Sequence, residues 1–160
     1  MAQSPTPSAG QALASLDFAD VSPQEFARIV KNLSTREIAE AFQGDLRLRA
    51  LREIFSRMQR LFRPDGAGSL KALIRWQIEG PAGTDPAVFE TAIADGTCTA
   101  TEGATPAEPR ATLTMSDVEF LKLVSGNGSP VTMFMMRKIK ITGDVGLAAG
   151  LTRLFDIPKA

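Results

Sequence analysis

Apolar and polar residues follow two different periods along this chain, and each change of period marks a change of element. Over residues 45–62 apolar side chains recur every three or four positions, which is the spacing of an amphipathic helix. Over residues 70–79 apolar and polar side chains alternate, with Leu73 as the sole exception, and this is the period of a half-buried strand. The pattern therefore predicts a long helix that leads into a β-sheet.

Two capping boxes predict two further helices before the long one. In each box a serine is followed three residues later by a glutamate, so that each side chain can bond a free backbone N–H near the other. Ser22 with Glu25 begins the first of these helices, and Ser34 with Glu37 begins a shorter second one. Residues 1–20 are rich in Ser, Pro, Ala and Gly and have little to bury, which predicts a disordered tail.

Four more strands are predicted after the first. Strands over residues 87–94 and 97–102 flank an Asp-Gly dipeptide, which is a strong signal for a two-residue hairpin turn. A fourth strand over residues 111–115 follows a loop that contains proline. Alternating lysine and isoleucine over residues 138–142 predict the fifth.

Helical patterns return around the fifth strand. A helix over residues 116–125 and a methionine-rich helix over residues 131–136 separate the fourth strand from the fifth. After the fifth strand Gly143 permits a turn with positive φ, and Asp144 caps a final helix over residues 145–155. The pattern therefore predicts a sheet whose strands are preceded and followed along the chain by helices.

The order of these parts resembles the sterol carrier protein type two family. Residues 133–144 are typical of an apolar helix, a basic-apolar strand and a Gly-Asp turn that leads into a leucine-rich helix. Family members end in a similar order of elements. Residues 76–80 look like the family's first long strand, and the Asp-Gly pair at 95–96 looks like its hairpin. The resemblance covers about residues 50–157, and many members have a glycine where this chain has Arg137.

This resemblance implies an α+β fold with a five-stranded, largely antiparallel sheet, helices packed over one face, and N-terminal helices in addition. We expect residues 1–20 to be a disordered N-terminal tail and residues 21–64 to be an N-terminal helical segment. Residues 65–160 would form the sterol-carrier-like lipid-binding domain, with helix 45–62 packed against it.

The resemblance also implies an apolar tunnel between sheet and helices, which binds and carries a sterol, a fatty acyl chain or another lipid. Methionine is flexible and polarizable, so a methionine-rich wall can repack around apolar molecules of different shape. From the residues alone, the methionine-rich segment is better explained as part of the hydrophobic core. With the family resemblance, a ligand-binding wall becomes the better explanation. The predicted ligand-binding residues are Trp76, Ile78, Phe89, Met115, Phe120, Val124, Met133, Phe134, Met136, Ile139, Ile141, Leu151, Leu154 and Phe155.

Charge is unevenly distributed in a chain whose net charge is zero. Residues 21–64 hold nine Lys or Arg against five acids, and residues 130–160 hold five against two. The long helix carries four arginines on its polar side: Arg49, Arg52, Arg60 and Arg63. A basic helix face of this kind is compatible with transient contact to an anionic membrane, and a solvated helix face is the alternative explanation.

The composition argues against most kinds of catalysis. There is no histidine, which removes the commonest general base and the commonest metal ligand. Cys98 is the sole cysteine, and its place on a predicted strand indicates a small buried hydrophobe instead of a reactive thiol. We therefore predict no metal ion, no cofactor and no enzymatic activity, with an enzyme acting on a lipid-like substrate in the tunnel as a minor alternative.

The sequence also bears on partners and location. Residues 36–40 resemble the first helix of a helix-turn-helix, but Gly44 follows Ala39 by five residues instead of four, so we predict no nucleic-acid binding. No apolar window approaches the length of a membrane span and no signal peptide is recognisable, which predicts a cytoplasmic protein. The main alternative to a lipid carrier is an accessory or oligomerisation module, in which residues 21–62 bind a protein partner or a second copy.

Overall fold

A mixed five-stranded sheet forms the centre of the computed structural model, which describes residues 22–41, 45–80 and 85–156. The strands are β1 (Ala72–Glu79), β2 (Ala87–Ala94), β3 (Thr97–Glu102), β4 (Ala111–Ser116) and β5 (Lys140–Gly143). Their order across the sheet is β3-β2-β1-β4-β5. β1 and β4 run parallel, and the other three neighbouring pairs run antiparallel. The predicted fold class, a largely antiparallel five-stranded sheet with helices, is confirmed.

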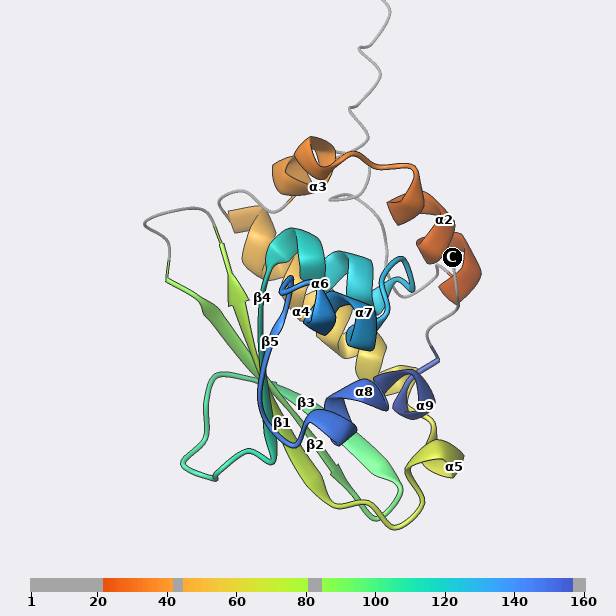
Figure 1. Cartoon of the computed structure of the whole chain (residues 1–160), viewed down its shortest axis with the longest axis vertical. Helices are drawn as coiled ribbons and strands as arrows, with labels where there is room; N and C mark the ends of the chain where they lie inside the picture. Colours follow the sequence, from red (N-terminus) through yellow and green to blue (C-terminus); the bar gives the residue numbers. More distant parts are fainter. Residues whose placement is uncertain (1–21, 42–44, 81–84, 157–160) are drawn as a thin grey trace, which may run out of the picture.

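Helices cover one face of this sheet, as Figure 1 shows. The helices over that face are α4 (Asp45–Arg60), α6 (Asp117–Val124), α7 (Pro130–Met135), α8 (Val145–Ala149) and α9 (Leu151–Leu154). At one end lie α2 (Pro23–Lys31) and α3 (Thr35–Ala41), and at the other lies α5 (Pro64–Ala67). The predicted N-terminal helices are thus present, while the predicted tail over residues 1–20 lies outside the described residues.

Local signals placed most of the element ends correctly. Ser34 Oγ accepts a hydrogen bond from the Glu37 N–H at 3.1 Å, and Glu37 Oε1 accepts one from the Ser34 N–H at 3.0 Å, which confirms the predicted capping box. Between β2 and β3, Asp95 and Gly96 have φ values of 53° and 73°. Two successive positive φ values are those of the type I′ turn that an Asp-Gly dipeptide favours.

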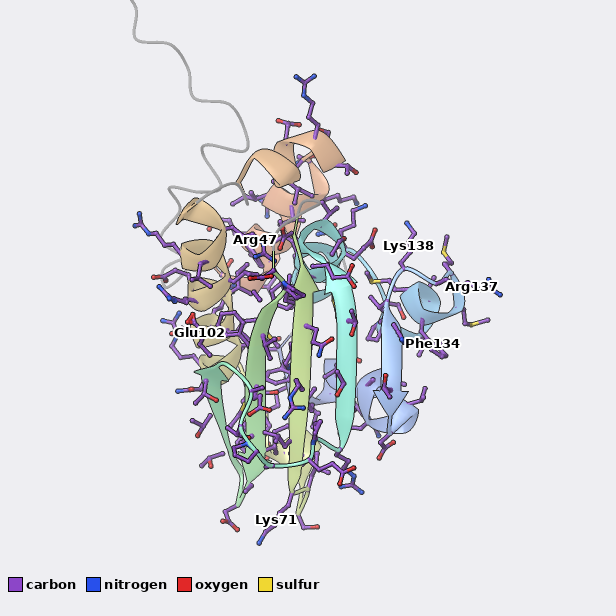
Figure 2. All side chains as sticks on the ribbon, turned by 90° about the vertical axis from the view of Figure 1, so that its left-hand side faces the viewer. Arg47, Lys71, Glu102, Phe134, Arg137 and Lys138 are labelled. Atoms are coloured by element: carbon purple, nitrogen blue, oxygen red, sulfur yellow. The ribbon has the colours of Figure 1, made fainter. Side chains whose placement is uncertain are left out.

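The loop between β3 and β4 covers part of the other face of the sheet. Because β4 pairs with β1 and not with β3, the chain has to cross the sheet here, and Figure 2 shows it doing so. Arg75 Nη2 donates to the carbonyl oxygens of Thr105 and Ala107 at 3.1 and 3.0 Å. The Thr105 N–H and Arg75 Nε donate to Glu90, at 3.0 and 2.8 Å. Burial would raise the pKa of Glu90, but these hydrogen bonds outweigh burial and lower it.

Two segments differ from the sequence prediction. The stretch after Arg63, which lies between the predicted helix over residues 45–62 and the predicted strand over residues 70–79, forms the one-turn helix α5, since Pro64 at its first position supplies a helical φ and needs no N–H partner. The final helix, expected to run unbroken over residues 145–155, is divided into α8 and α9 at Gly150. Glycine has the lowest helix propensity after proline, and this explains the break.

The turn into α8 follows the prediction closely. Gly143 has a φ of 90°, and a Cβ atom at this position would lie 2.5 Å from the carbonyl oxygen of Arg110. Asp144 Oδ1 then accepts a hydrogen bond from the Leu147 N–H at 3.0 Å, which caps α8 as expected. This turn returns the chain from β5, at the sheet edge, to the helical layer.

A cluster of four aromatic side chains fills the space between the sheet and the helices. We call Phe55, Trp76, Phe89 and Phe120 the aromatic cluster; they come from α4, β1, β2 and α6. The Phe55 ring stacks on Phe89 and Phe120 with centroid distances of 4.3 and 5.0 Å. Trp76 meets Phe55 edge-on at 5.8 Å, and its Nε1 donates to Thr91 Oγ1 at 3.1 Å. The interior of the domain is therefore closely packed at this level.

Candidate functional site

The predicted ligand-binding residues are divided between the core and the surface. Those that are buried, at 8% exposure or less, are Trp76, Ile78, Phe89, Met115, Phe120, Val124, Met133, Ile139, Leu151, Leu154 and Phe155. Ile141 is half-buried, whereas Phe134 and Met136 are exposed. The structure thus brings most of the set together in one core and leaves the end of the methionine-rich segment in contact with solvent.

A groove of about 400 Å³ opens where α2 faces α6 and α7. It is lined by Val30, Lys31, Leu33, Glu119, Lys122, Asn127, Gly128, Ser129, Thr132, Met133, Met136 and Lys138. Its apolar wall consists of Val30, Leu33, Met133 and Met136, and the last two are predicted ligand-binding residues. The volume lies within the range of about 300 to 1,000 Å³ that is typical of small-molecule sites.

Two other hollows contact the predicted set. Leu154 lines one of about 310 Å³, together with Arg110 and Asp144. Phe89 lines another of about 250 Å³, beside Arg52 and Glu102. Neither contains a methionine or more than one predicted residue, so the groove is the better candidate site.

Specific contacts hold the two sides of the groove in place. Asn127 Nδ2 donates to the carbonyl oxygen of Ala27 in α2 at 3.0 Å and to Ser125 Oγ, just after α6, at 2.8 Å. Arg57 of α4 also contacts α2, since its guanidinium lies over the Phe26 ring, 5.0 Å from the ring centroid. The position of α2 relative to α6 and α4 is therefore fixed by these contacts as well as by burial.

The position of Met133 in the apolar wall depends on a residue without a side chain, Gly128. Met133 is buried, and its Sδ atom lies only 2.6 Å from the place where a Cβ atom on Gly128 would be. Any larger residue at this position would push the methionine side chain aside. The close approach of the loop to α7 thus sets the depth of the groove.

α7 ends in a Schellman motif that places the rim of the groove. The Lys138 N–H donates to the Met133 carbonyl oxygen at 2.8 Å, and the Arg137 N–H donates to the Phe134 carbonyl oxygen at 3.1 Å. Arg137 has a φ of 60°, the left-handed conformation that usually selects glycine at this position. Because the chain is still in this turn, β5 begins at Lys140 and not at the predicted residue 138.

Much of the remaining groove lining is polar and mainly basic. Lys31, Lys122 and Lys138 line it together with one carboxylate, Glu119. Glu119 Oε2 is buried and accepts no hydrogen bond from the residues that the structure describes. The sequence analysis did not identify these four residues, because a single charged residue on an amphipathic helix is ordinarily interpreted as facing solvent. The Gly-Asn-Gly loop between α6 and α7 was the available signal, since it marks a close helix–helix approach.

A buried ion pair fixes the start of α6, which carries part of the groove. Arg47 Nε lies 3.1 Å from both carboxylate oxygens of Asp117, and Arg47 Nη2 donates to the Ile78 carbonyl oxygen at 2.6 Å. Both side chains are more than nine-tenths buried. Burial raises the pKa of Asp117, and the Arg47 guanidinium opposes part of that shift. The pair joins α4, β1 and α6 at one point.

Reactive groups are sparse in the described part of the chain. Cys98 is buried, and burial raises the pKa of its thiol to about 11, which keeps the thiol protonated and unreactive at neutral pH. Over residues 22–41, 45–80 and 85–156 no group of three or more His, Cys, Asp or Glu side chains could hold a metal ion. Within the same ranges no helix combines the length and the apolar character needed to span a bilayer.

These features define a class of small α+β domains in which helices cover one face of a mixed sheet and leave a groove at one end. The family described as the SCP-2 sterol transfer family matches residues 55–156, which is more than half of the chain. The chain therefore belongs to the SCP-2 sterol transfer family, and the resemblance inferred from the sequence is confirmed.

Three relatives show how far the similarity extends. Human Sterol carrier protein 2 is 46% identical over 43 residues, which are 27% of this chain and 8% of the human protein. Sterol Carrier Protein 2 from Yarrowia lipolytica, in its apo form, is 20% identical with a TM-score of 0.50, and the match covers 69% of this chain and 91% of that one. The sec-alkylsulfatase Pisa1 from Pseudomonas sp. is 15% identical with a TM-score of 0.56, over 94% of this chain and 27% of that enzyme.

The last match extends the shared fold to the N-terminal helices, because it covers 94% of this chain. This chain spans only a small part of human Sterol carrier protein 2 and of Pisa1. Similarity at 15 to 20% identity is similarity of fold.

Proposed function

We propose that this protein binds a lipid with an apolar body and one polar end, such as a sterol or a fatty acid, and carries it or presents it to another protein or membrane. The groove carries the proposal. Met133 and Met136 give it an apolar, adaptable wall on the segment where family resemblance implies ligand contact. Membership of the SCP-2 sterol transfer family supports the same class of ligand.

The polar side of the groove favours a ligand with a hydroxyl or acidic end. Glu119 lines the groove and one of its carboxylate oxygens accepts no hydrogen bond from the described residues, so a ligand hydroxyl that donates to the Glu119 carboxylate would be stabilised. The ammonium groups of Lys31, Lys122 and Lys138 also line the groove and can donate to a ligand oxygen. The apolar body would then lie along the methionine wall.

The aromatic cluster constrains how deep a ligand goes. Because Phe55, Phe89 and Phe120 are stacked on one another, the space between sheet and helices is already filled. We propose that Met133 and Met136 contact the ligand directly and that the buried members of the predicted set form an apolar floor beneath them. A longer lipid would reach that floor when the methionine side chains change rotamer.

The groove also bears on domain organisation. Its walls come from α2 on one side and from α6 and α7 on the other. We therefore propose that the helical segment over residues 21–64 and the domain over residues 65–160 act as one ligand-binding unit. The match to Pisa1, which includes the N-terminal helices, supports this.

A pair of adjacent methionines allows a direct test. Met136 lines the groove and is exposed, so Met136→Asp should leave folding nearly unchanged while placing a charge in the apolar wall. We expect the affinity for a fluorescent long-chain fatty acid and a fluorescent sterol to fall at least about tenfold. Met135→Asp is the matched control, because Met135 is exposed but does not line the groove. Equal losses in both variants, or none in Met136→Asp, would argue against this site.

An accessory or oligomerisation module is the second candidate function. The match to 27% of Pisa1 favours it, since the same fold there is one part of an enzyme. Contact through residues 21–62 has less support, because Phe26, Val30 and Ile38 are buried within the fold. The arginine face of α4 is also partly neutralised, for Arg52 pairs with Glu102 at 2.8 Å.

A further inference from the structure

α7 presents an apolar face that the described part of the chain leaves uncovered. The large apolar side chains that are exposed among the described residues are Val131, Phe134, Met135, Met136 and Val145. We call these five residues the α7 patch, since four belong to α7 and its C-cap and the fifth begins α8. Val131, Phe134 and Met135 are spaced i, i+3, i+4 and so lie on one side of the helix. An apolar patch gathered on one short helix marks an interaction surface.

Positive charge accompanies this patch. Residues 129–143 contain Arg137, Lys138 and Lys140 and no acidic residue, in a chain whose net charge is zero. All three basic residues are exposed, and none of them forms an ion pair with a carboxylate in the described residues. Figure 2 shows Phe134, Arg137 and Lys138 on the side formed by α7 and β5, opposite Glu102.

We propose that the α7 patch and these three basic residues dock the protein on the surface of an anionic phospholipid bilayer. Apolar side chains on a short surface helix can enter the boundary between headgroups and acyl chains. Long basic side chains keep their apolar stems beside the patch and extend their charges to lipid phosphates and carboxylates. A second copy fits less well, because its α7 patch would bring like charges together.

The groove opens at this docking surface. Met136 belongs to the α7 patch and also lines the groove, and Lys138 is both a docking residue and part of the groove's polar side. A lipid could therefore move between bilayer and groove along Met136 without drawing its apolar body through water. The docking inference goes beyond the proposed ligand binding, and a protein with an empty groove would still dock.

Vesicle sedimentation without added ligand tests the inference. The full chain is mixed with vesicles of phosphatidylcholine alone or of phosphatidylcholine with phosphatidylserine. Each basic residue near an anionic surface contributes about fivefold in affinity, so Arg137→Gln/Lys138→Gln should weaken binding to the anionic vesicles roughly 25-fold. Met135→Asp should weaken it at least about tenfold by placing a charge in the patch. The matched control, Arg49→Gln/Arg60→Gln, removes two exposed arginines from α4 and should change binding less than about twofold.

Three results would overturn the proposal. One is equal binding to neutral and anionic vesicles, and another is an equal loss in the α7 and α4 double variants. The third is a change in the sedimentation mass of vesicle-free protein on Met135→Asp, which would make the α7 patch an interface between copies. Fatty acid binding by Met135→Asp in solution is expected to stay normal, so failure of docking is distinguishable from failure of ligand binding.

Discussion

Phe55→Ala should lower the free energy of unfolding by about 3 to 5 kcal/mol, the usual cost of removing a large aromatic ring from a core. Phe55 is almost fully buried and contacts Trp76, Phe89 and Phe120 from three different elements. Hydrogen bonds of the sheet hold the surrounding strands in place, so the neighbouring side chains can fill only part of the cavity left by the Phe55 ring. Urea unfolding followed by tryptophan fluorescence measures the loss.

This variant also distinguishes a packed interior from a lipid tunnel. Met135→Ala, at an exposed position, is the control and should change stability by less than about 0.5 kcal/mol. A loss below about 1 kcal/mol for Phe55→Ala, together with tighter fatty acid binding, would contradict the packed interior. That outcome would return the ligand to the space between the sheet and the helices.

Arg47→Met should be about equally damaging at neutral pH, with a loss of about 3 to 5 kcal/mol, because it leaves a buried carboxylate without its partner. Arg47 bonds both oxygens of Asp117 and also the carbonyl oxygen of Ile78. Its removal therefore leaves acceptors from α6 and β1 unsatisfied. The same α4 offers a matched control in Arg52→Met, which breaks the exposed pair with Glu102 and should have a much smaller effect.

The loss in Arg47→Met should depend on pH. Burial raises the pKa of Asp117, so the folded state binds this proton more tightly than the unfolded state, and the stability it contributes is lost as pH rises through the folded pKa. Without Arg47 the opposing effect is gone and the pKa rises further. The difference from the unmodified protein should hence be largest at neutral pH and shrink as the pH falls and Asp117 takes up its proton in both proteins. A difference that does not change with pH would mean that the lost stability comes from packing.

Elements that depend on near neighbours in sequence were predictable. Capping by Ser34 and Glu37 and the hairpin at Asp95 and Gly96 involve contacts within three residues, so the sequence pattern specifies them directly. Parallel pairing of β1 with β4 depends on a crossing loop held by contacts 30 residues apart, such as Arg75 with Thr105, and no local pattern encodes it. Gly150 was a local signal for the division of the last helix, but the helical spacing of the leucines on both sides of it favoured a single unbroken helix.

The candidate site was predictable only in part. The methionine-rich segment indicated an adaptable wall, and Met133 and Met136 do line the groove. The facing wall comes from Val30 and Leu33, which are about a hundred residues away in the chain and meet α7 only through the packing of α2 on α6. Exposure of Met135 was not predictable either, since an apolar run gives no sign of which side chains the fold leaves uncovered.

Native mass spectrometry of the protein purified without detergent from its own host, followed by lipid extraction, tests the central claim most directly. The account predicts a second series of ions, heavier than the chain by the mass of one lipid, and recovery of that lipid in the extract. It also predicts that Met136→Asp loses the heavier series while Met135→Asp keeps it. Folded chain that carries no lipid in either form, or a heavier series that Met136→Asp leaves unchanged, would contradict ligand binding in the groove.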